Sequence, residues 1–563
     1  MKTSLVATIV FTLALIGCGG ATSETNATGS AQKSVARADQ NQMNPQPRES
    51  LRQGGKMVWA MDGVIVNFNT GQIDGTNAES YWVLAAMMPH PFITDAVGAL
   101  RYDPDYLTGE PTVTPGPPQV VKYELNPKAV WYDGTPITAA DYIAQWKALK
   151  GTNTAFHISS SNGYDHVQSA VQGANKFEVI VTFATPYADW RGLFSLLYPA
   201  STNSNPEIFN TGWKNSMLTV AGPFRLQNYD ATAKTYTLVP NEKWWGNKPK
   251  LDQIIFRVID NDAQPTAMAN GEIDLMDIGP SADEFNRVKA IQGVDIRVAG
   301  GPNFRHLTMN GTSPVLQDVN VRQALAMAID RSAIAKAELG QLPVTPVSLG
   351  NHLFMENQKG YQDNSGVVAY NPAKAKQMLD AAGWTVQGNK RVKNGQPLAI
   401  NLVIPGGIAV SRSESELIQN MLAQVNVQVN INTVPGDNFF DKYITPGQFD
   451  FTVFSWMGTP FPVSSGKSIY LKPVGDKIEQ NYARTGSDEL DHVFAQAVQQ
   501  LDPDKAIALA NDADKLIWQE VHSLALYQRP DLWGAKKGLA NIGAYGFADV
   551  VYEDIGWMSD AAR

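Results

Sequence analysis

The side chains that could carry chemistry are scattered along this sequence. Seven histidines are dispersed, and neither an HExxH motif nor paired cysteines give the spacing of a metal site. No GxSxG segment offers a serine nucleophile. Gly466-Lys467-Ser468 matches the end of a phosphate-binding loop, but Phe461 stands where the first glycine of that loop is needed. We therefore expect no metal, no cofactor and no enzymatic activity.

The single cysteine lies close to the amino terminus. Lys2 supplies a positive charge, and residues 5–16 form an apolar run that is too short to span a bilayer. The run ends in the string LIGC, which resembles the lipobox of bacterial lipoproteins and contains Cys18. This predicts a signal peptide over 1–17 and lipidation of Cys18, which places the protein at the extracytoplasmic face of the cell membrane. The alternative is an incidental thiol in a plain signal peptide.

The composition indicates an exported, folded protein with a polar leader. Hydrophobic residues make up 44% of the 563 residues, which is enough for large cores. The formal net charge of −9 argues against nucleic acid as a partner, because nucleic-acid binding needs clustered Lys and Arg. No aromatic residue occurs between Cys18 and Trp59, and this composition predicts a flexible tether over 18–55.

The first half of the chain is rich in predicted strands. Residues 56–60 suit a first strand, and the alternating apolar residues of 177–183 predict a strand with one buried face. Residues 224–228 and 235–239 flank a turn and predict a hairpin. Residues 254–259 form a nearly continuous apolar strand.

Helices and strands alternate in the second half, from about Phe304. Asn320 is a candidate helix cap, and Asn371 followed by a proline is another. Strands are predicted at 398–404 and 427–431, with an amphipathic helix between them. Strand, helix and strand joined by short loops are typical of a parallel crossover unit. The pattern predicts two α/β lobes, of which the second is the more regularly wound.

Six ordered segments carry a resemblance to a known family. In the first of them Asp133-Gly134 suits a turn, and Thr138 with Asp141 suits a helix cap. The segments are YELNPKAVWYDGTPITAADYIAQWKAL (123–149), GPFRL (222–226), NEKWWGNKPKLDQIIFRVI (241–259), NGEIDL (270–275), DVNVRQALAMAIDR (318–331) and YNPAKAKQMLDAAGW (370–384). Together they resemble the extracytoplasmic solute-binding proteins of peptide and nickel ABC transporters, known as family 5.

The resemblance implies an α/β, bilobed periplasmic-binding-protein fold of type II, with a hinge between the lobes. Lobe I would comprise 56–302 and 528–563, with an inserted subdomain at about 90–220. Lobe II would comprise 303–527. The lobes of such a protein close around the ligand, and the closed form signals loading to the permease.

The resemblance also implies a function. The chain would be a monomeric, lipid-anchored receptor of an ABC importer, which binds oligopeptides or peptide-like solutes and delivers them to the permease subunits. Many peptide-binding members carry an Asp shortly after a Gly-Trp pair, to hold the ammonium group of the ligand. Here Ser455-Trp456 stands for that pair and Thr459 for the Asp. Either another acid performs this task or the ligand has no free amine.

An alternative function stays open. The strings GYDHVQSAV (163–171) and TPYADWRGLFSLLYP (185–199) resemble an actinobacterial subgroup that includes LpqW. That lipoprotein has the receptor fold but is linked to cell-envelope lipoglycan synthesis. A regulator or scaffold of this type would act through surface contacts instead of transport.

The predicted ligand-binding residues follow strand ends. They are Trp456, Thr459, Phe461, Asn67, Asn69 and Asn310. Trp456, Thr459 and Phe461 belong to the second lobe, where open α/β sheets present ligands. Asn67 and Asn69 follow the first strand, and Asn310 is expected near the crossing between the lobes. The alternatives are a core tryptophan for Trp456 and a polar loop for the two asparagines after the first strand.

Overall fold

A ten-stranded mixed sheet runs through the folded part of the chain. The computed structural model describes residues 41–76, 78–475 and 478–559. In the order in which they pair, the strands are β17 (Gln428–Val434), β16 (Ala399–Pro405), β18 (Phe451–Met457), β12 (Val294–Met309), β19 (Ser523–Lys536), β11 (Leu275–Asp277), β1 (Lys56–Met61), β10 (Gln253–Val258), β9 (Thr235–Pro240) and β8 (Phe224–Asp230).

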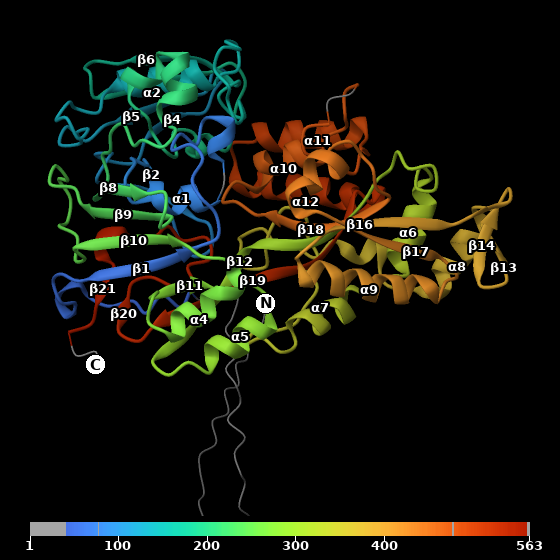
Figure 1. Ribbon diagram of the computed structural model, residues 1–563. Helices are drawn as coiled ribbons and strands as arrows, with labels where there is room; N and C mark the ends of the chain where they lie inside the picture. The colour runs from blue at the N-terminus through green and yellow to red at the C-terminus, as the bar shows by residue number, and fades with distance from the viewer. Residues whose placement is uncertain (1–40, 77, 476–477, 560–563) are drawn as a thin grey trace, which may run out of the picture. The chain divides into compact units, whose positions relative to one another are not determined.

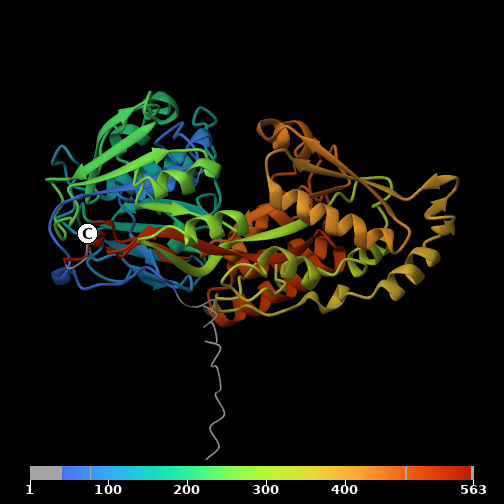
Figure 2. The ribbon, with the colours of Figure 1, turned by 60° about the horizontal axis from the view of Figure 1, so that its bottom comes forward.

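The two longest strands, β12 and β19, connect the lobes. They pair antiparallel along both lobes, but the register breaks between Gly300 and Phe304 on β12. Gly300 pairs with Pro530, whereas Phe304 pairs with Gln528, so extra residues bulge out of β12 at this point. The strands pass between the two lobes in Figures 1 and 2. The predicted lobe boundaries, 302/303 and 527/528, fall at this irregularity.

Lobe I carries a second sheet beside its half of the large one. The order of this four-stranded sheet is β4 (Thr112–Thr114), β5 (Val120–Glu124), β7 (Glu178–Phe183) and β6 (Val167–Gln172), and it lies within the region predicted as an inserted subdomain. The short strand pairs are β2 (Phe92–Thr94) with β3 (Leu100–Tyr102) and β20 (Leu539–Ala540) with β21 (Gly556–Trp557). The helices are α1 (Ala78–Ala85), α2 (Ala139–Leu149), α3 (Ala200–Asn203), α4 (Gln264–Ala269) and α5 (Ala282–Lys289).

The predicted turn and cap before α2 are confirmed. Gly134 has a φ of +87°, which a residue with a side chain rarely adopts. The Asp133 carboxylate accepts a hydrogen bond of 2.8 Å from the Thr135 backbone N–H. The Asp141 carboxylate accepts one of 2.8 Å from the Thr138 backbone N–H, as in a capping box. These local bonds fix the angle at which α2 enters the subdomain.

Lobe II has the predicted winding. Strands β16 and β17 are parallel and are joined through α9, as the crossover pattern predicts. One helix cap was placed wrongly: Asp318, and not Asn320, caps α6, because its carboxylate accepts from the Asn320 backbone N–H. The helices are α6 (Val319–Met327), α7 (Arg331–Leu339), α8 (Pro372–Ala381), α9 (Ala409–Ala423), α10 (Pro462–Tyr470), α11 (Asp488–Gln499) and α12 (Pro503–Glu520). The small hairpin strands are β13 (Thr385–Gln387), β14 (Lys390–Lys393) and β15 (Gln396–Pro397).

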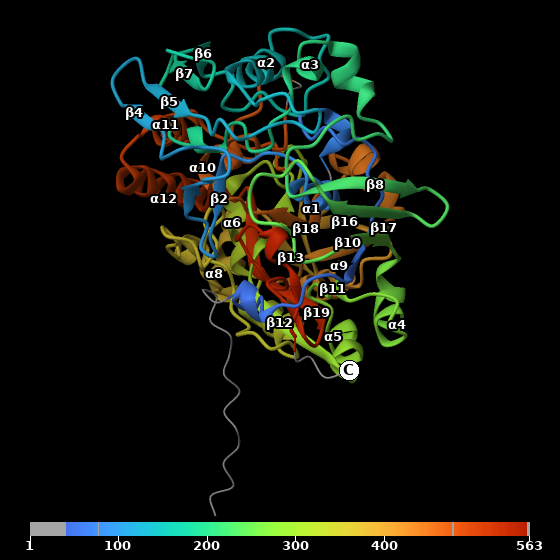
Figure 3. The same cartoon turned by 90° about the vertical axis from the view of Figure 1, so that its left-hand side faces the viewer.

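The two large hydrophobic clusters each contain residues of both lobes. One cluster lies mainly among β12, α6 to α9 and strands β16 to β18 of lobe II, and it continues into lobe I through residues such as Met268, Phe285 and Leu532. The cluster of lobe I includes Trp59 and Phe183, but it also contains Val463, Phe494 and Val498 of helices α10 and α11. Figures 1 and 3 show these helices beside the β4–β7 subdomain. Apolar contact therefore continues from one lobe into the other, as expected for a closed pair of lobes.

The predicted tether over 18–55 is too long. Residues up to 40, including Cys18, lie outside the described part, but Asn41 already donates a hydrogen bond of 2.8 Å to the Tyr545 carbonyl. Arg48 forms an ion pair with Asp554. Residues 41–55 thus belong to lobe I, because long-range bonds to the carboxy-terminal segment order a sequence that is poor in apolar side chains. Within the described residues, no helix combines the length and the apolar character that crossing a membrane requires.

Candidate functional site

The lobes meet where α10 and α11 face the β4–β7 subdomain. The Ala188 backbone N–H donates to the Val498 carbonyl at 2.8 Å. The Ser464 backbone N–H donates to Asp189 Oδ2 at 3.2 Å, and Asn162 Nδ2 donates to the Ser464 carbonyl at 3.1 Å. Ser464 is therefore bonded to lobe I through both its N–H and its carbonyl. These three bonds join residues that are about 300 positions apart in the sequence.

Phe461 packs against lobe I at the same contact. A Cβ atom placed on Gly192 would lie 3.0 Å from a ring carbon of Phe461, so the aromatic ring approaches the Gly192 backbone closely. A side chain at position 192 would push the ring away. The structure thus brings Phe461, a predicted site residue, to the boundary between the lobes.

Asp189 is a half-buried acid at this boundary. Burial raises the pKa of its carboxyl above the usual value, and the hydrogen bonds from Ser464 offset part of that rise. The carboxyl accepts a hydrogen bond from Ser464 of the other lobe.

Trp456 stands on β18 in a stack of aromatic rings. Its indole lies parallel to the imidazole of His306, with ring centres 5.6 Å apart, and parallel to Tyr482, 5.7 Å away. Phe454 meets the indole edge-on. Trp456 is half-buried, and its neighbour Met457 is 57% exposed. The indole therefore covers part of the core of lobe II and also reaches its surface near the crossing.

Thr459 shapes the turn that leads into α10. Its hydroxyl accepts a hydrogen bond of 3.1 Å from the Phe461 backbone N–H and lies 3.0 Å from the Ser465 hydroxyl. Its carbonyl accepts from Gln358 Nε2 at 3.0 Å. Thr459, which resemblance places at the position of an Asp in many peptide-binding members of the family, therefore holds Phe461 and α10 in place.

Asn67 and Asn69 are fully buried in the loop after β1. Asn67 Nδ2 donates to Gln72 and to the Asn210 carbonyl, both at 3.2 Å. Asn69 Nδ2 donates to the Phe209 carbonyl at 3.1 Å. Both amides hold the loop, and Asn69 also lines a cavity described below. Direct contact of either residue with a ligand stays a prediction.

Asn310 is not near the crossing between the lobes, and this expectation was wrong. It follows the end of β12, six residues beyond Phe304, which corresponds to about 20 Å of extended strand. Its Nδ2 donates to the Gly447 and Phe449 carbonyls at 3.1 and 2.9 Å. The error arose because the length of β12, and hence the point at which it crosses, is not evident from the sequence.

A cavity of about 300 Å³ adjoins the contact between the lobes. Its walls come from α2, α3, the loop after β1 and the loops that flank β6 and β7, and its lining residues include Asn162 and Gly192. These two residues touch Ser464 and Phe461 of lobe II. None of the lining side chains is charged. The cavity thus lies in lobe I, and two of its lining residues contact the start of α10.

Sequence reasoning missed Asn162, Asp189, Gly192 and Ser464. None of them belongs to a recognisable ligand motif, and their proximity depends on the closure of the lobes. A signal was nevertheless present. Asp189 and Gly192 lie in the string 185–199, one of the two that resemble an actinobacterial subgroup, and Asn162 immediately precedes the other.

A buried ion pair supports the strands of lobe II behind this site. Arg305 Nε on β12 donates to Glu414 Oε1 on α9 at 3.0 Å, and both side chains are at most 5% exposed. The Tyr527 hydroxyl on β19 donates to the same carboxylate at 2.7 Å. The pair therefore ties together both crossing strands and α9.

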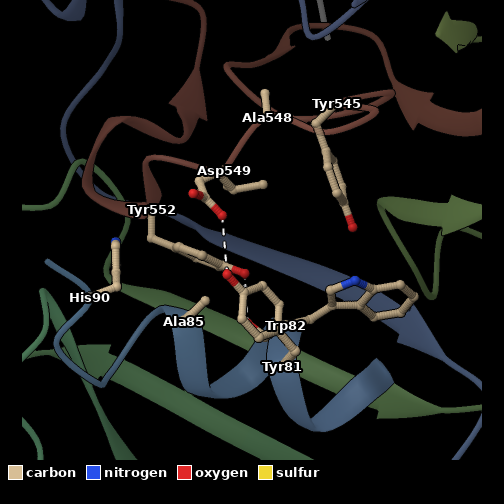
Figure 4. A pocket seen from close by; sticks show the side chains of 9 residues that line it. Tyr81, Trp82, Ala85, His90, Tyr545, Ala548, Asp549 and Tyr552 are labelled. Carbon is tan, nitrogen blue, oxygen red and sulfur yellow. Dashed lines mark hydrogen bonds between the residues drawn. The ribbon is translucent and has the colours of Figure 1, made fainter. Parts of the chain in front are cut away.

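A second hollow lies within lobe I and measures about 50 Å³ (Figure 4). In it the Tyr81 hydroxyl donates to Asp549 Oδ1 at 3.1 Å, and Asp549 Oδ2 accepts from the Thr94 backbone N–H at 2.7 Å. The hollow has room for little more than a water molecule, and lobe II contributes nothing to its walls. Across the described residues, no group of three or more His, Cys, Asp or Glu side chains is arranged to hold a metal ion.

Comparison with known proteins identifies the family. The family described as bacterial extracellular solute-binding proteins, family 5 Middle, matches residues 112–477. The oligopeptide-binding protein OppA of Mycobacterium tuberculosis is 39% identical over 559 residues, with 99% of this chain and 93% of that protein covered. LpqW of the same species is 25% identical over 359 residues, with 62% and 54% covered. The structure of the periplasmic EDTA-binding protein EppA has a TM-score of 0.84 at 26% identity, with 94% of this chain and 99% of that one covered. On both sequence and fold, this chain belongs to the bacterial extracellular solute-binding proteins of family 5.

Proposed function

We propose that this chain is the receptor of an ABC importer, and that it binds peptides or peptide-like solutes between its lobes and delivers them to the permease. The observation that carries the proposal is the 39% identity to an oligopeptide-binding protein over 99% of the chain. The aligned region includes both lobes and the crossing strands, so the similarity extends over the whole protein and not over one domain.

The contact between the lobes supports a mechanism of enclosure. The segment from Thr459 to Ser464 lies on lobe II, and its Ser464 and Phe461 contact Asn162 and Gly192, two residues that line the lobe I cavity. A solute in this region would be shielded from water when the lobes close, which strengthens its hydrogen bonds to the protein. Release requires the bonds of Ser464 to lobe I to break. We expect ligand affinity and lobe closure to change together.

The ligand is not held by an acid at the position of Thr459. The hydroxyl there already serves the turn before α10, and a neutral group cannot balance a buried ammonium. The cavity beside the contact has no charged lining either. We infer that the ligand presents uncharged polar groups to this part of the site.

The protein is further proposed to be held at the extracytoplasmic face of the membrane by a lipid on Cys18. The string LIGC supports this, because the cysteine follows an apolar run of signal-peptide length. Two acyl chains on one residue would give stable anchoring.

The proposal is tested by native mass spectrometry of protein purified gently from its own membrane. The expected result is a complex heavier than the apoprotein that releases peptides on denaturation, together with ABC permease subunits in crosslinked samples. The weaker likeness to LpqW, 25% over 62% of the chain, supports a second candidate, an envelope regulator. A persistently empty protein that crosslinks to enzymes of lipoglycan synthesis would establish that candidate and overturn the receptor.

A further inference from the structure

Arg529 has a guanidinium group that no described side chain engages. The residue lies on β19 and is half-buried. Its Nε is buried and has no hydrogen-bond partner. Its two terminal nitrogens also form no hydrogen bond or ion pair with a described residue, but they are not buried, so they reach solvent. A guanidinium has five N–H donors, and a half-buried group with unmet donors calls for an explanation.

The register of the large sheet places Arg529 where the two lobes face each other. In lobe I, the last residue of β11, Asp277, lies opposite Trp533 of β19. Because β11 is antiparallel to β19 and parallel to β1, the carboxyl ends of β11 and β1 point along β19 towards Arg529. In lobe II, β18 ends at Met457, which lies opposite Asn303 in the bulge of β12. Strands of both lobes therefore point their carboxyl ends at the crossing.

The guanidinium of Arg529 lies over the loop that follows β11. A Cβ atom placed on Gly279 would lie 3.0 Å from Arg529 Nη2. Gly279 has a φ of +60°, and its backbone N–H donates to Asp277 Oδ1 at 2.7 Å, which fixes the loop. Open α/β sheets present ligands outside the carboxyl ends of their strands. Arg529 thus stands where a solute held between the lobes would lie.

Acidic side chains lie near the guanidinium without forming an ion pair with it. Desolvation raises the pKa of Asp277, and the charge of Arg529 is the largest of the effects that offset this rise. Desolvation also raises the pKa of Asp62, whose Oδ1 already accepts from Gln264 Nε2 at 2.7 Å. Desolvation and then the charges of these two aspartates raise the pKa of Glu284 on α5 to about 7. Acids that resist ionisation are weak counter-charges, so the positive charge of Arg529 is available to a ligand.

A carboxylate is the group that fits the unmet donors. A guanidinium donates two parallel N–H···O bonds to a carboxylate, and both bonds are strengthened by charge. A neutral carbonyl would engage fewer of the donors and would leave the charge of Arg529 unbalanced once the lobes exclude water. Closure would therefore favour a solute that brings a carboxylate to this place over one that brings an amide.

We propose that Arg529 binds a carboxylate of the solute at the crossing between the lobes, through its two terminal nitrogens. The inference rests on the proposed function, since the solute is taken to be a peptide or a peptide-like compound. It deepens that function by requiring a carboxylate in the ligand. In a peptide this group is either the carboxy terminus or an acidic side chain, and the experiment separates the two sources.

The test uses the full chain, emptied of ligand, and a small set of peptides. The set contains pentaalanine with a free carboxy terminus, pentaalanine amide, and pentaalanine amides that carry Glu at each position in turn. Native mass spectrometry measures their competition. We expect the free acid or at least one Glu peptide to bind about tenfold more tightly than pentaalanine amide. Preference for the free acid assigns the carboxy terminus to Arg529, and preference for a Glu peptide assigns a side chain.

Two variants and one control connect the preference to Arg529. Arg529→Gln removes the charge and should lower the preference for a carboxylate about tenfold, while the affinity for pentaalanine amide stays unchanged. Arg529→Lys keeps the charge but lacks the planar pair of donors, and it should lower the preference about threefold. Arg257 also belongs to lobe I, but its guanidinium is paired with Glu272 at 2.9 Å. Arg257→Gln should leave the preference unchanged.

The failures are distinguishable. If no peptide binds to the emptied protein, the proposed receptor function is overturned, and the role of Arg529 with it. If peptides bind, but acids and amides compete equally throughout the set, the carboxylate site is overturned alone. A preference that survives in Arg529→Gln would show that another group holds the carboxylate, and it would overturn the assignment to Arg529. Unchanged affinity for pentaalanine amide in each variant shows that the rest of the site is intact.

Discussion

The indole of Trp456 lies parallel to the imidazole of His306, with 5.6 Å between the ring centres and 8° between the planes. His306 is fully buried, and burial lowers the pKa of its imidazole well below the usual value, so the ring is neutral at physiological pH. Trp456 thus contributes to the core of lobe II and to the surface near the crossing at the same time.

Replacing Trp456 by Ala should affect both stability and binding. The half-buried indole loses contacts with rings on two sides, which should lower the free energy of unfolding by about 2 kcal/mol. Peptide affinity should also fall, because the surface near the crossing loses an aromatic wall. Trp456→Phe should recover much of the stability. Denaturant unfolding and peptide titration measure the two effects, and an unchanged unfolding curve would contradict the packing role.

A methyl group on Gly192 should hinder closure. In Gly192→Ala the new Cβ would lie 3.0 Å from the ring of Phe461, so the ring must move before the lobes can meet. Peptide affinity should fall about tenfold while the free energy of unfolding changes little. In the double variant with Phe461→Ala the clash is absent, and affinity should partly recover. Additive losses in the double variant would show that the two residues do not meet.

Ligand affinity should weaken as the pH rises, through Asp189. Closure buries this carboxyl and raises its pKa above that of the open form, so the closed form retains the proton to higher pH. Closure is then favoured at low pH, and this advantage is lost as the pH rises through the raised pKa. Asp189→Asn should flatten the profile between pH 4 and 8. The exposed Asp512→Asn serves as control and should leave the slope as it is in the native protein.

Breaking the buried ion pair of lobe II should be costly. Glu414→Ala leaves the Arg305 guanidinium buried without a counter-charge, which should lower the free energy of unfolding by about 3–5 kcal/mol. Replacing both partners by apolar residues, as in Arg305→Met with Glu414→Leu, should restore a large part of the loss. Chemical denaturation measures each variant. A double variant less stable than Glu414→Ala would contradict this account.

Cys18 should carry the lipid. Cells grown with an alkyne-tagged fatty acid should label the native protein and leave Cys18→Ser unlabelled, whereas Ser23→Ala should be labelled normally. Because Cys18 is the one cysteine of the chain, label in Cys18→Ser could not sit on another thiol. Such label would overturn the lipid anchor without bearing on the binding site.

Local patterns predicted much of the fold. The alternation over 177–183 and the parallel unit of β16, α9 and β17 appear as expected, because periodicity and short loops specify neighbours in the sequence. The cap at Thr138 is confirmed for the same reason. The cap at Asn320 was placed two residues late, since Asp and Asn are equally good caps and both occur there.

The candidate site was less accessible to sequence reasoning. Thr459 and Phe461 could be picked out because they follow a strand in the wound lobe, but the contacts of Asp189 with Ser464 and of Gly192 with Phe461 arise from the folding of distant segments. The position of Asn310 relative to the crossing depends on the register break in β12, which leaves no local signature. Contacts between lobes, unlike caps and strands, are not encoded by neighbouring residues.

The attachment of residues 41–55 to the carboxy-terminal segment has a mechanical consequence. Because Asn41 and Arg48 are bonded to lobe I, the chain leaves the folded body from that lobe. If Cys18 carries the proposed lipid, the anchored end of the chain is attached to lobe I, and rotation of lobe II about the bulge at Gly300 would leave that attachment in place. Solute affinities measured on protein released from the membrane should then equal those of the anchored protein.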